Sequence, residues 1–301
     1  MNDARSDFAI ETQRLSRFYG DRYALRDLTL AVPRGGVHAL VGRNGAGKTT
    51  LLRVLLGFVG PSGGTSRVLG EDSATLSAEV RGRIAYGTEE HALPGWMTVA
   101  SLRALHARTY PRWDEGAYGE VARRFHLPDA RRVSHLSNGQ RAGLALALAL
   151  AQSPDILLLD DPTLGLDPVA RQTFVETLLF VGKRDETTVI YSSHDLDEVE
   201  RVADDVIILV DGGLAAFAPP DQIHARISAW ILDDLPEGCA IPGLLQARNI
   251  EGQTQIVVLD QGADFGSRLE ALGARGLTPW PLGFDRAINA FLSGYGTRRD
   301  S

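Results

Sequence analysis

Short apolar runs recur along the first 220 residues of the chain and are separated by stretches with helical spacing. Residues 155–161 and 187–195 each contain a short apolar run that ends in polar groups, which is typical of strands buried on both faces. Residues 35–42 form another short apolar run, and residues 47–59 after it have the spacing of an amphipathic helix. This alternation predicts an α/β fold.

The segments around this framework predict antiparallel strands and further helices. Apolar and polar residues alternate along residues 8–32, with a turn between two such stretches, as in an antiparallel β pair. Residues 204–220 predict a hairpin with Asp-Gly-Gly at its turn. Residues 98–135 are mostly helical in pattern. Residues 144–151 alternate Leu and Ala with the period of a strand, but both are strong helix formers and we predict a helix. Two more strands and a helix are predicted at residues 66–72, 83–89 and 196–203.

The composition changes after the two prolines at 219–220. Beyond about residue 223 the pattern predicts a helix and a strand. A hairpin at residues 247–260 and two helices at residues 265–276 and 283–294 follow. We therefore predict a large domain at residues 1–222 and a small α+β domain at residues 223–301.

Composition narrows the classes of function. The formal net charge of −7 over 301 residues argues against a nucleic-acid partner, because such partners usually require a basic surface. The single cysteine, Cys239, excludes an internal disulfide framework and fits a reducing compartment. The first residues lack the apolar core of a signal peptide, and no apolar run has the length of a membrane span. We expect a soluble cytoplasmic protein that reaches a membrane only through a partner.

Residues 42–49 read GRNGAGKT and fit the phosphate-binding pattern G-x-x-x-x-G-K-[ST], between a predicted strand and a predicted helix. Glycines let successive backbone N–H groups converge on phosphate oxygens, and the helix N-terminus adds a partial positive charge. Lys48 is expected to reach the β- and γ-phosphates, and the Thr49 hydroxyl to hold Mg²⁺. The predicted ATP-binding residues of this loop are Gly42, Arg43, Asn44, Gly45, Ala46, Gly47, Lys48, Thr49 and Thr50.

Two carboxylates end the apolar run at residues 155–161. A phosphate-binding loop needs an acid at the end of a neighbouring strand to complete its Mg²⁺ site, and Asp160 has that position. Asp161 is then placed to orient or deprotonate water. Helix capping or turn solvation is the alternative for two acids at a strand end, and the phosphate-binding loop makes it the weaker one.

Residues 136–168 contain motifs that a phosphate-binding loop alone does not require. LSNGQ resembles the signature loop of the ATP-binding cassette (ABC) family, normally LSGGQ, and lies as in that family shortly before the strand that ends in Asp160. The resemblance implies that this loop completes the nucleotide site of a second cassette; in isolation it would be an ordinary helix cap. The signature residues are Leu136, Ser137, Asn138, Gly139 and Gln140.

Further motifs match in the family's order over about residues 8–220. Leu166 and Asp167 lie in GLDP, which resembles the D-loop that crosses the dimer interface. His194 follows a predicted strand like the family's switch histidine, which contacts the γ-phosphate. Tyr19 takes the place of the aromatic residue that stacks on adenine, with core packing as the alternative.

Two positions depart from the family pattern. Asp161 stands where the family usually has Glu, and Glu89 stands in place of the lid glutamine. We take Asp161, His194 and Glu89 as candidate catalytic residues, and Thr49, Asp160 and Glu89 as candidate Mg²⁺ ligands. Because Glu89 adds negative charge beside a triphosphate, these departures bear on the rate of hydrolysis more than on nucleotide binding.

The insertion at about residues 88–150 resembles the helical subdomain of the family. In its transporters, a groove beside the lid loop receives a helix of the membrane subunit, and Leu93, Pro94, Trp96 and Met97 would suit such a groove. The alternative places Trp96 and Met97 in the core.

These resemblances imply a P-loop NTPase sheet with an antiparallel β subdomain, a helical insertion and a small C-terminal α+β domain like that of exporter ATPases. They imply that the chain binds and hydrolyses ATP with Mg²⁺ as the nucleotide-binding subunit of an ABC transporter, peripheral on the inner face of the cell membrane. The implied partners are an integral membrane subunit and a second cassette, identical or related, and no nucleic acid. The alternatives are a non-transport ABC ATPase and an ATP-dependent clamp deficient in hydrolysis.

Overall fold

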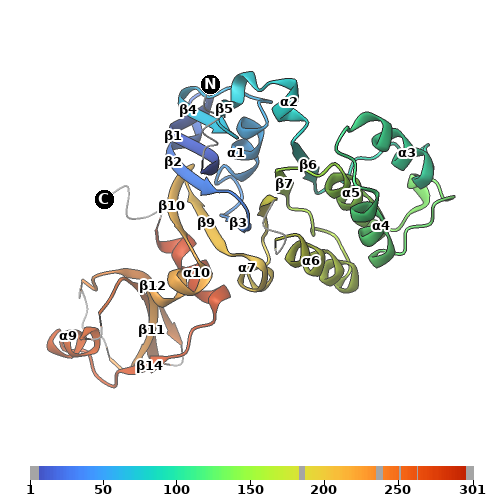
Figure 1. The fold of residues 1–301 in the computed structure, drawn as a ribbon. Helices are drawn as coiled ribbons and strands as arrows, with labels where there is room; N and C mark the ends of the chain where they lie inside the picture. The colour runs from blue at the N-terminus through green and yellow to red at the C-terminus, as the bar shows by residue number, and fades with distance from the viewer. Residues whose placement is uncertain (1–6, 183–186, 235–239, 251, 263, 296–301) are drawn as a thin grey trace.

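The computed structural model describes residues 7–182, 187–234, 240–250, 252–262 and 264–295 (Figure 1). Three sheets organise this part of the chain: one of six strands and two of four strands. The six-stranded sheet carries the candidate site, and the last sheet is formed by the C-terminal region. The predicted α/β fold is confirmed.

The six-stranded sheet is formed by β3 (Val37–Val41), β6 (Ile84–Thr88), β7 (Ile156–Asp160), β8 (Thr188–Ser192), β9 (Asp205–Val210) and β10 (Gly213–Ala218). Its order is β10-β9-β3-β8-β7-β6, and all neighbours are parallel except β9 and β10. Every residue of β3, β7 and β8 is buried, as expected for apolar strands covered on both faces. The antiparallel pair β9–β10 is the hairpin that the Asp-Gly-Gly turn predicted.

The two faces of this sheet belong to two different cores. Alternate residues of a strand point to opposite faces. Leu158 of β7 packs in one core with α1 (Lys48–Leu55), and Leu157 packs in the other with α5 (Asn138–Ala151) and α6 (Pro168–Gly182). The helix that follows the phosphate-binding loop is therefore held against the ends of the strands that carry the candidate carboxylates.

The antiparallel sheet near the N-terminus has the order β2-β1-β4-β5. Its strands are β1 (Phe8–Tyr19), β2 (Arg22–Pro33), β4 (Gly63–Val68) and β5 (Glu71–Asp72). The pairing of β1 with β2 confirms the predicted β pair. Buried residues of this sheet share a core with α1, so the sheet encloses α1 from the side away from β7.

The helical insertion consists mainly of α3 (Val99–Thr109), α4 (Glu115–Arg124) and α5, while the short α2 (Ala78–Arg81) precedes β6. Thr98 and Asp114 accept hydrogen bonds from first-turn N–H groups and so begin α3 and α4. The Leu/Ala alternation lies in α5, so helix propensity outweighed the strand-like period. Within the described ranges, no helix has both the length and the apolar character needed to cross a membrane.

The C-terminal region forms the last sheet, of order β12-β13-β11-β14. Its elements are α8 (Pro220–Ala225), β11 (Ile227–Leu232), β12 (Leu244–Ile250), β13 (Gln253–Leu259), α9 (Phe265–Ala271), β14 (Thr278–Trp280) and α10 (Phe284–Gly294). α10 packs against α7 (Leu196–Val202), and Ile288 joins the buried core that contains Val199 of α7. Figure 1 shows α10 between α7 and β12. The C-terminal region thus shares a core with the region that carries the candidate site.

Candidate functional site

The predicted phosphate-binding loop connects β3 to α1, and close backbone contacts require its glycines. Gly47 is the N-cap of α1 with a φ of 103°, and a Cβ at this position would lie 2.3 Å from the carbonyl oxygen of Ala24. A Cβ on Gly42 would lie 2.7 Å from the carbonyl oxygen of Leu209. Because Gly47 has no side chain to cap α1, the first-turn N–H groups are left for another acceptor. The loop therefore offers N–H donors and the positive end of a helix dipole to an anion.

Lys48 is held inside this loop. Its Nζ donates a hydrogen bond to the carbonyl oxygen of Gly42 at 2.7 Å, and the residue is 6% exposed. Burial lowers the pKa of Lys48, while the charges of Asp161 and Asp160 oppose this shift. Both carboxylates therefore lie near the ammonium group, as a site for a phosphate-bound metal requires.

A serine that the sequence analysis did not single out connects the two carboxylates. Ser192 ends β8, the parallel neighbour of β7. Its hydroxyl donates to Asp160 Oδ1 at 3.0 Å and accepts from the Asp161 N–H at 2.8 Å. Asp161 Oδ2 lies 3.2 Å from Nε2 of His194, the second residue after Ser192. The chain of contacts Asp160–Ser192–Asp161–His194 thus spans the ends of two neighbouring strands.

The candidate Mg²⁺ ligands are hard oxygen donors on adjacent elements. Thr49 lies in the first turn of α1, which contacts β7, and Asp160 is the last residue of β7. Thr88 of β6 is the register partner of Asp160, so the exposed Glu89 comes directly after this pair. In the part of the chain that the structure describes, no three His, Cys, Asp or Glu side chains gather to hold a metal. These residues fit Mg²⁺, which commonly combines one or two carboxylates with water and substrate phosphates.

Tyr19 lies at the end of β1 and is 47% exposed, so the core-packing alternative for this residue is wrong. The guanidinium carbon of Arg17 lies 4.7 Å from the centroid of its ring. The register partner of Tyr19 is Arg22 of β2. Arg22 is two residues from Ala24, whose carbonyl oxygen lies close to Gly47. An exposed aromatic ring is therefore present on the hairpin next to the phosphate-binding loop, where it suits a nucleobase.

The signature loop and the D-loop pack against each other. Ser137 caps α5 in a capping box: its Oγ accepts from the Gln140 N–H at 3.1 Å, and Gln140 Oε1 accepts from the Ser137 N–H at 3.2 Å. A Cβ on Gly139 would lie 2.5 Å from the Cβ of Ala170 in α6. Asp167 begins α6, since its Oδ1 accepts from the Ala170 N–H at 3.0 Å. The helix-cap geometry is thus present, and a role of this loop toward a second nucleotide stays a prediction.

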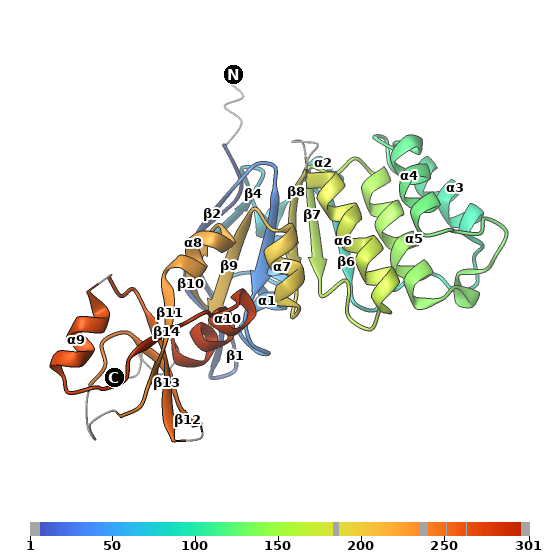
Figure 2. The ribbon, with the colours of Figure 1, turned by 90° about the horizontal axis from the view of Figure 1, so that it is seen from below.

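The predicted site residues fall into two groups that stand apart. The phosphate-binding loop lies with the two carboxylates, whereas the signature loop lies with the D-loop. In both Figures 1 and 2, β6 and β7 separate α1 from α5. The remaining predicted residues are buried at Ala46, Leu136 and Leu166, half-buried at Thr50, and exposed at Arg43, Asn44, Gly45 and Asn138.

The C-terminal helix also reaches the candidate site. A cavity of about 380 Å³ opens beside Asp161 and His194, and Asp285 and Asn289 of α10 form part of its wall. Sequence reasoning placed α10 in a separate domain and missed this contact. The available signal was the spacing of these two polar residues, one turn apart on a helix that is otherwise mostly apolar.

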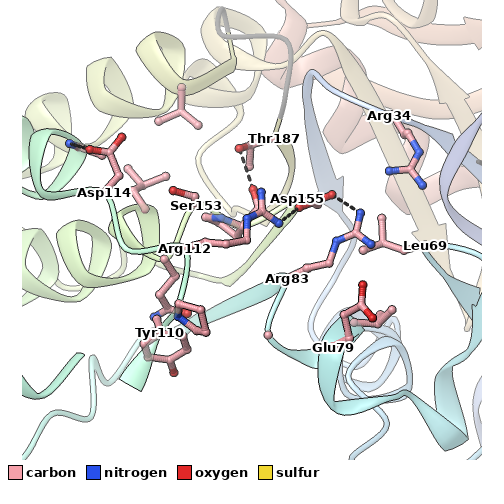
Figure 3. Close-up of a pocket in the computed structure, with 18 of the residues that line it drawn as sticks. Arg34, Leu69, Glu79, Arg83, Tyr110, Arg112, Asp114, Ser153, Asp155 and Thr187 are labelled. Atoms are coloured by element: carbon pink, nitrogen blue, oxygen red, sulfur yellow. Dashed lines mark hydrogen bonds and ion pairs between the residues drawn. The ribbon is translucent and has the colours of Figure 1, made fainter. Parts of the chain in front are cut away.

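A larger cavity, of about 1360 Å³, lies elsewhere (Figure 3). Its lining includes Arg83 before β6, Asp155 before β7 and Thr187 before β8, so it opens at the N-terminal ends of the parallel strands. The phosphate-binding loop follows the opposite end of β3. Figure 3 shows Arg83 and Arg112 converging on Asp155, to which both donate hydrogen bonds. This cavity is therefore not part of the candidate nucleotide site.

Asp155 is expected to stabilise the fold in a pH-dependent way. Partial burial favours its neutral form, but the hydrogen bonds and charges of Arg83 and Arg112 outweigh burial and hold the pKa of Asp155 below its usual range. Such a carboxyl contributes stability above its unfolded-state pKa of about 3.9 and loses it as the pH falls through the lower folded-state value. Asp155→Asn should therefore lower the free energy of unfolding at pH 7 by about 1–2 kcal/mol.

Urea denaturation across pH checks this prediction. The difference between Asp155→Asn and the unaltered protein should be constant between about pH 7 and 5 and shrink below about pH 4. Asp129→Asn is the control, because Asp129 is 62% exposed and lies 3.9 Å from Arg103, so its loss should change little. A difference that did not depend on pH would contradict a role of the Asp155 charge.

Trp96 and Met97 have different surroundings. Trp96 is 76% exposed, so the core alternative is wrong for this residue. Met97 and Leu93 are half-buried and pack against the main core, and Pro94 is half-buried. Trp96 therefore presents an exposed indole on the segment that follows the lid position Glu89.

Known proteins are similar in sequence to most of this chain. The ABC transporter family profile matches residues 25–164. The daunorubicin/doxorubicin resistance ATP-binding protein DrrA of Streptomyces peucetius is 34% identical over 233 residues, with 74% of this chain and 69% of DrrA covered. The sulfate/thiosulfate import ATP-binding protein CysA of Yersinia pseudotuberculosis is 33% identical over 253 residues, with 80% of this chain and 69% of CysA covered.

A solved structure of the ATP-binding subunit of an ABC transporter also matches, with a TM-score of 0.64 and 28% identity. The match covers 72% of this chain and 92% of that chain. Sequence relatives, fold and motif geometry agree. The chain belongs to the ATP-binding proteins of ABC transporters, and it is an ATPase.

Proposed function

We propose that this chain binds ATP and Mg²⁺ between its own phosphate-binding loop and the signature loop of a second cassette, and that hydrolysis there powers an exporter. One observation carries the proposal: the Asp160–Ser192–Asp161–His194 chain of contacts beside Lys48. It combines a phosphate-binding cation, a metal-binding carboxylate and a carboxylate for water in one place. The ATPase reaction requires these three functions together.

The loop and its surroundings hold the nucleotide. Loop N–H groups and Lys48 bind the β- and γ-phosphates and balance the charge that develops on them during transfer. Thr49 and Asp160 would hold Mg²⁺, with Glu89 as a further candidate, and the ion would neutralise part of the charge on the phosphates. Tyr19 stacks on the adenine ring.

Asp161 and His194 act on the γ-phosphate side. The Asp161 carboxylate orients the attacking water or accepts its proton. His194, which contacts Asp161 in this structure, turns its ring nitrogen to the γ-phosphate when nucleotide is bound. Ser192 keeps the backbone of Asp161 in place through the bond to its N–H. The distance from the water to the γ-phosphorus therefore depends on the contact between β7 and β8.

We expect ATP to join two cassettes, and Ser137→Arg to prevent this. The signature loop stands apart from its own phosphate-binding loop, so a nucleotide that it contacts would have to be bound to a second cassette. Light scattering with ATP under conditions of slow hydrolysis should show a doubled mass for the unaltered protein and a single cassette for the variant. Where the partner is a related cassette, the same measurement is made on the mixture.

Two further variants separate the interface from helix capping. Ser137→Ala removes the cap, at a cost of about 1 kcal/mol, without adding bulk or charge, and should still dimerise. Ser101→Arg adds the same side chain at an exposed position of α3 and should also dimerise. An ATP-dependent mass increase in Ser137→Arg equal to that of the unaltered protein would contradict the arrangement in trans.

The membrane partner is proposed to dock beside the lid segment, and the transport direction is proposed to be export. The exposed Trp96 supports docking, because Trp is enriched at protein interfaces. The resemblance of the C-terminal domain to exporter ATPases supports export. In proteoliposomes containing the complete complex, cargo added on the cassette side should stimulate phosphate release. Stimulation only from the opposite side would show import.

A further inference from the structure

A cavity of about 440 Å³ lies in the C-terminal region, between the last sheet and α10. This volume is in the range of small-molecule sites, about 300–1,000 Å³. Strands β12 and β13 form one wall, Trp280 and Leu282 another, and α10 the third. No sequence motif of the ATPase lies in it, so the known reaction does not account for it.

The cavity is positively charged within an acidic protein. Arg248 and Arg286 line it, and none of its described lining residues is Asp or Glu, whereas the whole chain has a formal net charge of −7. The guanidinium carbon of Arg286 lies 5.3 Å from the centroid of the Trp280 ring, a cation–π contact that holds this cation at the cavity. Two guanidinium groups without a carboxylate between them favour an anion.

The rest of the lining is suited to an apolar body with a polar end. Val257 and Ala290 are buried at the cavity, and the half-buried Trp280 adds an aromatic surface. Gln246 and Gln255 add amide groups that can donate or accept hydrogen bonds. An apolar wall with a few convergent polar groups is the usual composition of a ligand site.

We propose that this cavity binds a small organic anion with a flat apolar body, such as an aromatic carboxylate, and that the bound anion regulates the ATPase. Its carboxylate pairs with Arg248 and Arg286, and its ring lies against Val257, Ala290 and Trp280. The regulatory part rests on the ATPase role described above; the binding part does not.

The regulatory connection runs through α10. Asn289 lines this cavity and also the cavity that contains Asp161 and His194. α10 packs against α7, whose first residue, Leu196, is the second residue after His194. A ligand that fixes α10 therefore acts on a helix directly joined to the histidine of the candidate site.

Calorimetric titration of the full-length protein with naphthoate tests the binding. We expect saturable binding with one site per chain. In Arg248→Glu/Arg286→Glu it should weaken by about tenfold or more, because two charge-assisted contacts are replaced by repulsion. Arg275→Glu, an exposed change in the same region away from the cavity, should bind naphthoate normally. Naphthalene methanol, which has the same ring without the charge, should bind weakly to all forms.

Two readouts keep the test decisive. If the double variant fails to fold, as circular dichroism would show, the single variants Arg248→Gln and Arg286→Gln replace it. Absence of saturable naphthoate binding, or equal binding by the folded charge variants, would overturn the site whatever the ATPase does. For regulation, saturating naphthoate should change the affinity for ATP, and ATP should change the affinity for naphthoate by the same factor. Normal naphthoate binding without this reciprocal change would overturn the coupling through α10 and leave the ATPase assignment intact.

Discussion

Lys48→Ala is expected to reduce ATP hydrolysis by about 100-fold or more and to weaken ATP binding, because it removes the buried cation that we propose binds the phosphates. The fold should be unaffected. Burial already disfavours the charged form of Lys48, and the hydrogen bond from its Nζ to the carbonyl oxygen of Gly42 closes a loop that Gly42 and Gly47 shape through backbone contacts. Phosphate release and binding of a fluorescent ATP analogue measure the two effects.

Arg53→Ala is the matched control for this prediction. Arg53 is an exposed cation in the last turn of α1, the helix that begins at Lys48, so the variant changes the same charge on the same element away from the loop. It should hydrolyse ATP normally. Thermal unfolding of Lys48→Ala at nearly the temperature of the unaltered protein would confirm that the fold is intact. Normal binding and turnover by a folded Lys48→Ala would show that the loop does not hold the triphosphate.

Asp161→Asn is expected to lower the rate of hydrolysis by a factor on the order of 10² to 10⁴ while ATP binding is retained. The amide cannot accept the proton of the attacking water, but it keeps the shape of the side chain and the backbone bond to Ser192. ATP binding should persist because the loop, Lys48 and Asp160 are unchanged. If Asp161→Asn hydrolysed ATP at the normal rate, Asp161 would leave the mechanism and His194 would become the next residue to test.

Asp161→Glu separates two explanations for the short acid at this position. Asp161 has a φ of 48°, in the left-handed region that Asp tolerates better than most residues, and its carboxylate already reaches His194 at 3.2 Å. A carboxylate about 1 Å farther out can cost on the order of 10² in rate, so we expect slower hydrolysis by the Glu variant. Maintained or faster turnover would show instead that Asp161 is a shortened version of the family's usual acid.

The sequence determined the framework of the fold because its signals are local. Apolar runs bounded by polar ends predicted β7 and β8, and the Asp-Gly-Gly turn predicted the β9–β10 hairpin. The glycines at 42 and 47 predicted a phosphate-binding loop. The structure shows why glycine is needed there, because a Cβ at either position would clash with a backbone carbonyl oxygen. Short-range pattern and turn chemistry suffice wherever neighbours in sequence set the conformation.

Local pattern was less informative where apolar and polar residues of a helix are not clearly segregated along the sequence. Helix α6 (Pro168–Gly182) was not predicted, because its apolar residues lack a clear helical face. Its start depends on the side chain of Asp167, which accepts from the Ala170 N–H, and the D-loop motif drew attention to the same residue for another reason. The burial of Trp96 could not be predicted from the sequence either, because a bulky apolar residue is usually expected in the core. Only the folded chain shows that it is 76% exposed.

Only the tertiary structure decided which distant residues meet at the site. Ser192 is an unremarkable serine in the sequence, and it bonds Asp160 and Asp161 because β8 pairs in parallel with β7 in one particular register. Asp285 and Asn289 reach the cavity of Asp161 because α10 packs on α7, although residues 203–283 separate the two helices in the sequence. Contacts of this kind depend on strand order, register and helix packing, which are set by how whole surfaces fit together. The sequence by itself therefore determined the chemical groups of the candidate nucleotide site, and the packing of the chain determined which of them lie together.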